Sequence, residues 1–358
     1  MKRRAFLLTP LLLPALSPAA ARAAAPRYAA ANRATRLAFP RDHGAHPEFR
    51  TEWWYVTGAL DLPERDIGFQ LTFFRSRPGV AEDLDSPIAA SQILFAHAAI
   101  TQPGGRLLHA ERAARANLGA GFSATDCDVH IGPWQMQRRG AGTEEHLQIG
   151  MQDAAFAFDL LLKPTQALLL QGEHGWSQKG PRPALASHYV SWPQMLAAGS
   201  VTLDGRRQAA TGRAWFDHEW SSEVLGAGSV GWDWIGINLD DGGALMAFRI
   251  RNAAGETVHA HAALRDAGGR LRQFGASEVS FTPMRRWTSP RNGAQYPVQM
   301  EIRCGPHTIQ TAPVLDDQEI TARRPLPVSY WEGLVAIRGT LAGRGYLELT
   351  GYAGALQL

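Results

Sequence analysis

The stretch IGFQLTF at residues 67–73 alternates apolar side chains with small or polar ones. In a β-strand this alternation puts the apolar set on one face, and FAFDLLL at 156–162 repeats the pattern. The best helical signal, HAERAARANL at 109–118, is short and bounded by glycines, so it predicts at most a minor surface helix. Glycine-containing turn signals recur at 204–205, 241–243, 268–269 and 343–345. We therefore expect an all-β protein of antiparallel barrels or strongly curved sandwiches.

The length of 358 residues favours two domains. Pro193 interrupts the strand pattern of YVSWP at 189–193, and the densest cluster of aromatic and ionisable residues begins shortly afterwards, at Gly212. We place the junction near 203–215, with an N-terminal unit at 40–206 and a C-terminal unit at 207–358.

The charge is concentrated at the N-terminus. Residues 1–25 carry four of the 36 basic residues and none of the 33 acidic ones, so the rest of the chain is close to neutral. A nucleic-acid partner is therefore not expected. With 45% hydrophobic residues the chain is also not of the disordered class.

Residues 1–25 have the layout of a secretory signal peptide. Lys2-Arg3-Arg4 precedes an apolar run from Ala5 to Leu16, and Ala21-Arg22-Ala23 supplies small residues for cleavage. The run is too short and too rich in proline to span a membrane, and RRAFLL at 3–8 resembles a twin-arginine signal. We expect an exported, periplasmic protein without a membrane span, in which Cys127 and Cys304 are two isolated buried thiols rather than a disulfide.

The first cluster that could carry chemistry combines DHGAHP at 42–47 with Glu52-Trp53-Trp54-Tyr55. On a strand, Trp53 and Tyr55 share one face while Glu52 and Trp54 share the other. Either face brings aromatic surface and a polar group into a barrel, so ligand binding and plain core packing are both open. Asp42, His43 and His46 could bind metal, but a solvated loop is the favoured interpretation.

The second cluster is Asp217-His218-Glu219-Trp220, with Trp232 and Trp234 nearby. A histidine beside an indole in an enclosed pocket could transfer a proton while the ring stabilises positive charge. Alternatively, His218 and Trp220 hold the junction of the halves together. No zincin or P-loop motif is present, and AGSVG at 227–231 is interpreted as a strand connection rather than a nucleophile elbow.

Four segments carry a family resemblance: HPEFRTEWWYVTGAL at 46–60, SHYVSWPQM at 187–195, GRAWFDHEW at 212–220 and YWEGLVAIRGTLAGRGYLELTGY at 330–352. In this order they resemble the AttH / carotenoid 1,2-hydratase family. The resemblance implies two tandem lipocalin-like β-barrels. It also implies catalytic roles for Asp217, His218 and Trp220 in a hydratase.

The resemblance leads to two functional expectations. The first is an exported protein that holds an apolar lipid- or isoprenoid-like ligand against Glu52, Trp53, Trp54, Tyr55, Trp232 and Trp234, as the accessory component of an ABC export system with its permease as partner. The alternative is a carotenoid 1,2-hydratase-like enzyme, or a secreted hydrolase, in which His218 is the acid, Asp217 orients it or activates water, and Trp220 stabilises a cation. Neither needs a metal or an organic cofactor. We further expect His218 and Trp220 to share one pocket with the strand 52–55.

Overall fold

Alternating side chains on β1 (Thr51–Asp61) and β2 (Asp66–Ser76) form the start of the first sheet, as the pattern at 67–73 predicts. The computed structural model describes residues 27–84, 86, 88–325 and 327–356. Within them the regular elements are strands and three short 3-10 turns, at Arg41–His43, Gly142–Glu144 and Ala276–Glu278. The predicted all-β class is confirmed. The predicted signal peptide lies outside the described residues.

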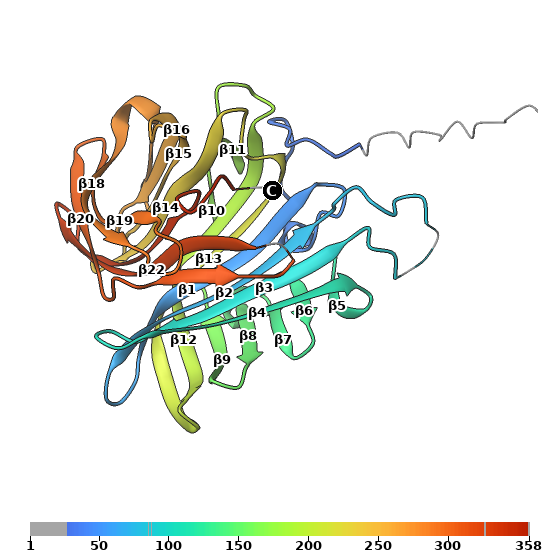
Figure 1. Cartoon of the computed structure of the whole chain (residues 1–358), viewed down its shortest axis with the longest axis horizontal. Coiled ribbons are helices and arrows are strands. Elements are labelled where there is room, and N and C mark those ends of the chain that lie inside the picture. The colour runs from blue at the N-terminus through green and yellow to red at the C-terminus, as the bar shows by residue number, and fades with distance from the viewer. Residues whose placement is uncertain (1–26, 85, 87, 326, 357–358) are drawn as a thin grey trace, which may run out of the picture.

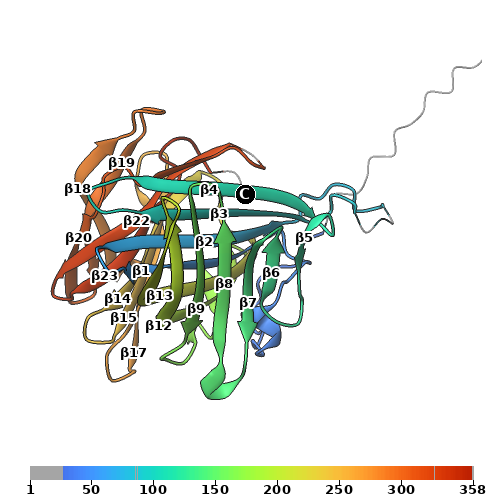
Figure 2. The ribbon, with the colours of Figure 1, turned by 90° about the horizontal axis from the view of Figure 1, so that it is seen from below.

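The first sheet closes into a barrel because β12 (Ala186–Leu203) pairs with both β13 (Arg206–Glu223) and β9 (Phe156–Lys163). The order around the ring is β12-β13-β1-β2-β3-β4-β5-β6-β7-β8-β9, part of which Figure 2 shows from below. All neighbouring strands of the ring are antiparallel except β4 and β5. The other strands are β3 (Ile93–Thr101), β4 (Leu107–Ala116), β5 (Gly119–Phe122), β6 (Asp128–Ile131), β7 (Trp134–Arg139) and β8 (His146–Gln152), and two short strands, β10 (Leu169–Leu170) and β11 (Trp176–Gln178), pair with β12.

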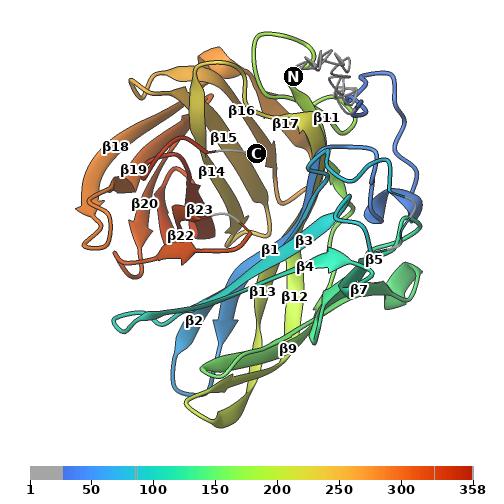
Figure 3. The same cartoon turned by 45° about the vertical axis from the view of Figure 1, so that its right-hand side comes forward.

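The second sheet has the order β17-β16-β15-β14-β23-β22-β20-β19-β18, with β21 beside β22. Its edge strands do not pair with each other, so it forms an open half-barrel, seen as a curved half-ring in Figure 3. Its strands are β14 (Ser229–Leu239), β15 (Ala244–Asn252), β16 (Thr257–Arg265), β17 (Leu271–Phe274), β18 (Val279–Thr288), β19 (Gln295–Cys304), β20 (His307–Pro313), β21 (Glu319–Ala322), β22 (Val328–Gly339) and β23 (Gly343–Leu349).

The two sheets pack against each other through the outer face of the barrel at β1, β12 and β13 (Figure 1). β9 faces solvent on one side and alternates buried and exposed residues, whereas β1 is buried on both faces along most of its length. One face of β1 contributes Trp54 and Val56 to the barrel core. The other contributes Tyr55 and Ala59 to a core shared with the second sheet. The long apolar runs of these strands therefore reflect two interfaces rather than one.

Two predictions about local structure differ from what is observed. HAERAARANL at 109–118 falls mostly on β4, which pairs with β3 from Leu107 to Arg115, so sheet pairing overrides the helical propensity of its alanines and charged residues. The change from the first sheet to the second comes between Glu223 and Ser229 rather than at 203–215, because β13 completes the barrel.

Other features concern the cysteines and membrane spans. Cys127 and Cys304 are free and buried in separate cores. Among the described residues no helix has the length and hydropathy needed to cross a bilayer.

Candidate functional site

The two motifs singled out in the sequence lie side by side on antiparallel β1 and β13, where Trp54 is opposite His218 and Tyr55 is opposite Asp217. Because side chains alternate along a strand, each motif is divided between the two faces of the sheet. The barrel-facing residues are Glu52, Trp54, His218 and Trp220. The residues facing the second sheet are Trp53, Tyr55, Asp217 and Glu219.

On the barrel side, Asp42, His46, Glu52, Arg75 and His218 form a buried polar group, here called the Glu52 cluster. One carboxylate oxygen of Glu52 lies 2.8 Å from Nδ1 of His46 and 2.9 Å from Nε2 of His218. The other accepts a hydrogen bond from Nε of Arg75 at 2.7 Å. Nε2 of His46 lies 3.2 Å from the Asp42 carboxylate, and Nδ1 of His218 lies 3.1 Å from the Asp42 backbone carbonyl. Every ring nitrogen of the two histidines therefore faces an oxygen.

The charges in the Glu52 cluster compensate one another. Burial alone would raise the pKa of Glu52, but the charge of Arg75 and hydrogen bonds from His218 and His46 hold this pKa well below its usual value. Burial would lower the pKa of His46, yet its bonds to Asp42 and Glu52 raise it. For His218 burial dominates, and its pKa is lowered. A desolvated group of this kind is stable only while all its partners are present.

The Glu52 cluster also contains a donor set typical of metal sites. Ligand atoms of His46, Glu52 and His218 lie within 4.8 Å of one another, and two histidines with one carboxylate can bind zinc. However, the Glu52–histidine distances are hydrogen-bond distances between the side chains themselves, and Arg75 occupies the second oxygen. The cluster is therefore complete as a hydrogen-bonded network that ties residues 42–46 to the barrel.

Aromatic rings enclose this network. The His46 ring stacks on Trp220 with 3.7 Å between ring centroids, and Trp54 stacks on His218 with 4.8 Å between ring centroids. Asp42, His43 and His46 are only 5%, 3% and 2% exposed. The expectation of a solvated loop at these residues is thus wrong, because the cluster pulls the segment into the end of the barrel.

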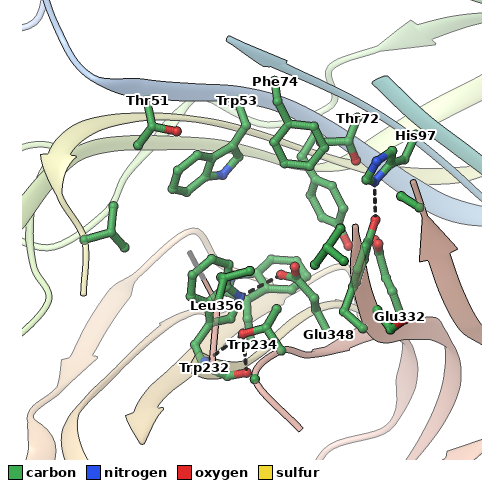
Figure 4. A pocket seen from close by; sticks show the side chains of 18 of the residues that line it. Thr51, Trp53, Thr72, Phe74, His97, Trp232, Trp234, Glu332, Glu348 and Leu356 are labelled. Atoms are coloured by element: carbon green, nitrogen blue, oxygen red, sulfur yellow. Dashed lines mark hydrogen bonds between the residues drawn. The ribbon is translucent and has the colours of Figure 1, made fainter. Parts of the chain in front are cut away.

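On the opposite face of the same strands, a cavity of about 720 Å³ lies between the two sheets. Figure 4 shows Trp53, Thr72, Phe74 and His97 on one side of it, with Trp232, Trp234, Glu332 and Glu348 on the other. The aromatic and aliphatic lining also includes Tyr55, Phe95, Tyr189, Phe248, Ile250 and Tyr330, and the C-terminal residues Ala353–Leu356 line it as well. The lining of the cavity is mainly apolar with a few polar groups.

Asp217 is one of the polar groups that the first sheet contributes to this cavity. It accepts hydrogen bonds from Tyr189 Oη at 2.7 Å, Ser191 Oγ at 2.5 Å and Trp215 Nε1 at 2.7 Å. Burial raises its pKa to about 7, although these three donors favour the charged form. Burial therefore favours the protonated form of Asp217 more than in an exposed aspartate.

Glu219, two residues along the same face, is paired instead. Its carboxylate lies 2.8 Å from Nζ of Lys179, which sits 4.2 Å above the ring of Phe248. Ser187 donates a hydrogen bond to the same carboxylate. The ammonium group of Lys179 is therefore already paired with a carboxylate of the protein.

The second sheet contributes a pair of glutamates, Glu332 on β22 directly opposite Glu348 on β23. Burial raises the pKa of Glu348 to about 7, against the effect of a 2.9 Å hydrogen bond from Trp232 Nε1. Burial, followed by repulsion from Glu348, raises the pKa of Glu332 well above its usual value. At neutral pH this pair is at least partly protonated, as expected for like charges in an apolar enclosure.

The residues predicted for one site thus fall into two groups. Trp53, Tyr55, Asp217, Trp232 and Trp234 line the cavity. Glu52, Trp54, His218 and Trp220 lie in the barrel interior behind it. His218 and Trp220 lie together with Glu52 and Trp54 of the strand 52–55, as expected, but they do not share the cavity that Trp53 and Tyr55 line. His218 and Trp220 contact only the Glu52–Trp54 face of β1, because one residue of register separates the two faces.

Several cavity residues were not singled out from the sequence: His97, Lys179, Tyr189, Tyr330, Glu332 and Glu348. A signal for the glutamates is present in the segment 330–352, where Tyr330 and Glu332, and Tyr346 and Glu348, share a face by period-two alternation. A carboxyl group on an otherwise apolar strand face marks a position that needs a special environment.

Comparison with known proteins places this fold in a family. A crystal structure of a Nitrosomonas europaea protein assigned to AttH matches with a TM-score of 0.83 and 42% identity, covering 90% of this chain and 99% of that one. Kievitone hydratase from Nectria haematococca matches with a TM-score of 0.67 at 14% identity, over 92% and 97% of the two chains. CghA matches with a TM-score of 0.54 at 13% identity, over 89% of this chain and 97% of that one. No curated protein sequence matches the chain. The AttH-like family profile covers residues 30–352, and the chain belongs to this family.

Proposed function

We propose that this protein binds an apolar, lipid- or isoprenoid-like small molecule in the cavity between its two sheets. The observation that carries the proposal is the cavity of about 720 Å³ between the sheets, with its mainly apolar lining. Small-molecule sites in proteins have this size and composition, with a few polar groups that orient the ligand.

Aromatic side chains of the two sheets pack against one another at the cavity wall. The rings of Trp53 and Trp232 are nearly parallel with 6.4 Å between their centroids, and the rings of Tyr55 and Trp234 meet edge to face with 5.4 Å between their centroids. Trp234 is fixed further by a 2.9 Å hydrogen bond from Nε1 to Tyr189. A preformed apolar site loses little conformational entropy when it binds a ligand.

Titration with N-phenyl-1-naphthylamine, an uncharged apolar fluorophore, tests the proposal. Trp53→Ala removes part of one wall and should raise the Kd about tenfold, because loss of about 1.4 kcal/mol of apolar contact from a partly buried side chain corresponds to one decade in Kd. Trp287→Ala is the matched control, since Trp287 packs on Tyr296 away from the cavity. Absence of saturable binding, or equal effects of the two variants, would count against the proposal.

A second candidate function is acid-catalysed hydration of an isolated double bond. It is favoured by cavity carboxyl groups that are partly protonated near neutral pH, Asp217 and Glu348. In this reaction a carboxylic proton moves to an alkene carbon, water adds to the resulting cation, and the water proton returns to a carboxylate. These groups, rather than His218 behind the sheet, face the bound molecule.

Incubation with squalene in ¹⁸O-labelled water tests this second candidate. An alcohol carrying the label, formed by the wild type and the Trp287→Ala variant but not by Asp217→Asn, would support it. Ligand binding without any labelled product would contradict the hydration reaction and support ligand binding as the function.

The finer role that we propose is that of an exported accessory protein of an ABC export system. Its support is the signal-like pattern of residues 1–25 and the AttH-type resemblance of the motifs. Affinity capture of the full-length protein from its native host, with identification of a co-purifying permease, tests this role.

A further inference from the structure

Three strands bring a second group of polar side chains to one end of the cavity. Tyr330 and Glu332 alternate along β22, Glu348 faces Glu332 from β23, and Tyr55 comes from β1 of the other sheet. Tyr330 Oη lies 2.8 Å from Nδ1 of His97 on β3, as the dashed line in Figure 4 shows. Both sheets therefore contribute to this group.

Two polar atoms in this group lack a hydrogen bond of good geometry within the described chain, Tyr55 Oη and Glu332 Oε1. Glu332 lies close enough to Tyr55 and Tyr330 for hydrogen bonds among these three side chains to shift their pKa values, but the Tyr55–Glu332 contact does not have good hydrogen-bond geometry. Tyr55 is 7% exposed and Glu332 is 2% exposed, so solvent does not replace the missing partners. A ligand oxygen between Tyr55 and Glu332 would replace their poorly oriented contact with hydrogen bonds of better geometry.

We propose that Tyr55, Tyr330 and Glu332 form a subsite for an uncharged oxygen of the ligand, which is then an oxygenated apolar molecule such as an alcohol or ketone. A phenol donates and accepts hydrogen bonds, and a neutral carboxyl group does the same, which matches a hydroxyl or carbonyl oxygen. This inference rests on the proposed ligand-binding function and specifies the class of ligand.

The charges around the subsite disfavour the ionic alternatives. A carboxylate ligand would meet Glu332, Glu348 and Asp217, and the nearby Lys179 is already paired with Glu219. An ammonium ligand would require ionisation of a carboxyl group whose pKa burial raises, and so would create a desolvated ion pair. An uncharged oxygen avoids both costs.

Four probes with the same fifteen-carbon body separate these possibilities: farnesene, farnesol, farnesylamine and farnesoic acid. Their affinities are measured by quenching of tryptophan fluorescence, because Trp53, Trp232 and Trp234 line the cavity. We expect farnesol to bind about 2- to 10-fold more tightly than farnesene, as one net hydrogen bond implies, and more tightly than the amine or the acid.

Tyr55→Phe and Glu332→Leu should each reduce the farnesol preference, measured as the ratio of the farnesene Kd to the farnesol Kd in the same variant, toward one. Glu332→Gln, which keeps a donor and an acceptor, should retain the preference. Tyr28→Phe is the matched control, since Tyr28 lies at the surface beside Arg50 and Arg77.

The outcomes distinguish the subsite from the ligand-binding function on which it rests. Equal binding of farnesol and farnesene, or tighter binding of the amine or the acid, overturns the subsite while the ligand-binding function stands. Failure of all four probes to bind overturns the proposed function and the subsite together.

Discussion

His218 and Asp217 are adjacent in the chain but lie on opposite faces of β13. His218 is fully buried and bonded to Glu52 and to the Asp42 carbonyl, whereas Asp217 lines the cavity with three donors around it. The two residues therefore experience different surroundings. At this scale, the face of the strand determines whether an ionisable side chain stabilises the barrel or meets a ligand.

The His218→Ala substitution tests that division. Removal of the ring leaves Glu52 without one donor and opens space beside Trp54, so the free energy of unfolding should fall by about 1–3 kcal/mol. Cavity binding of N-phenyl-1-naphthylamine, measured well below the melting temperature, should change less than about twofold because the ring does not line the cavity. Urea unfolding and fluorescence titration measure the two effects. A loss of binding with an unchanged melting temperature would instead support the role implied by the family resemblance.

At the scale of elements, the pairing of β22 with β23 creates the glutamate pair. Each strand places its acidic residue on an apolar face two positions after a tyrosine, and the antiparallel register sets the two directly opposite. Like charges opposite one another on neighbouring strands are destabilising when ionised. The pair is thus tolerated because burial keeps its carboxyl groups partly protonated.

This arrangement predicts a pH-dependent effect of Glu348→Gln. The pKa of Glu348 is about 7 in the folded state, above its ordinary value of 4.5. The stabilisation by protonated Glu348 is therefore complete below pH 4.5 and is lost as the pH rises through 7. Relative to wild type, the variant should gain up to about 3 kcal/mol between pH 4 and pH 8. Urea unfolding at both pH values measures the difference. Glu256→Gln, at an exposed position, is the control, and an equal gain at both pH values would contradict the assignment.

At the scale of the whole molecule, the barrel and the half-barrel share a continuous apolar interface. Tyr55, Tyr189 and Trp215 of the first sheet pack with Trp234 and Phe248 of the second. Hydrogen bonds also cross it: Tyr330 lies 2.8 Å from His97, and Thr101 donates to Gln318 at 2.8 Å. Neither sheet can expose this face to water without a large loss of apolar burial.

We therefore expect the chain from residue 27 onward to unfold in one calorimetric transition. A fragment of residues 207–358, the predicted C-terminal unit, should not fold cooperatively, because β13 would lose β12 and β1 and the strands facing the cavity would be exposed. Near-ultraviolet circular dichroism of the fragment and calorimetry of the chain measure this. Two separate transitions would indicate independent domains.

Processing of the N-terminus is a further prediction at this scale. We expect cleavage after Ala23 to Ala25 and a mature chain in the periplasmic fraction, because the small residues there follow a charged segment and an apolar run. Intact-mass measurement on protein from the native host decides this. Retention of residues 1–23 in the exported protein would contradict it.

The sequence by itself determined the class of the fold and the existence of both motifs. Period-two alternation is a local property, so residues such as Ile67, Phe69 and Leu71 reveal a strand without knowledge of its neighbours. The same rule divided Glu52 and Trp54 from Trp53 and Tyr55. Alternation could not tell which set faces a cavity.

Only the tertiary structure decided which face of β1 lines the cavity and which residues make up the site. Tyr330 meets His97 although the two are 233 residues apart, and Glu332 gains its unusual environment from a register that no local pattern specifies. The segment 109–118 became β4 because pairing with β3 outweighs helical propensity. Local alternation predicts that a strand forms, whereas long-range pairing fixes which strands meet, and the cavity exists only between two sheets that have already paired.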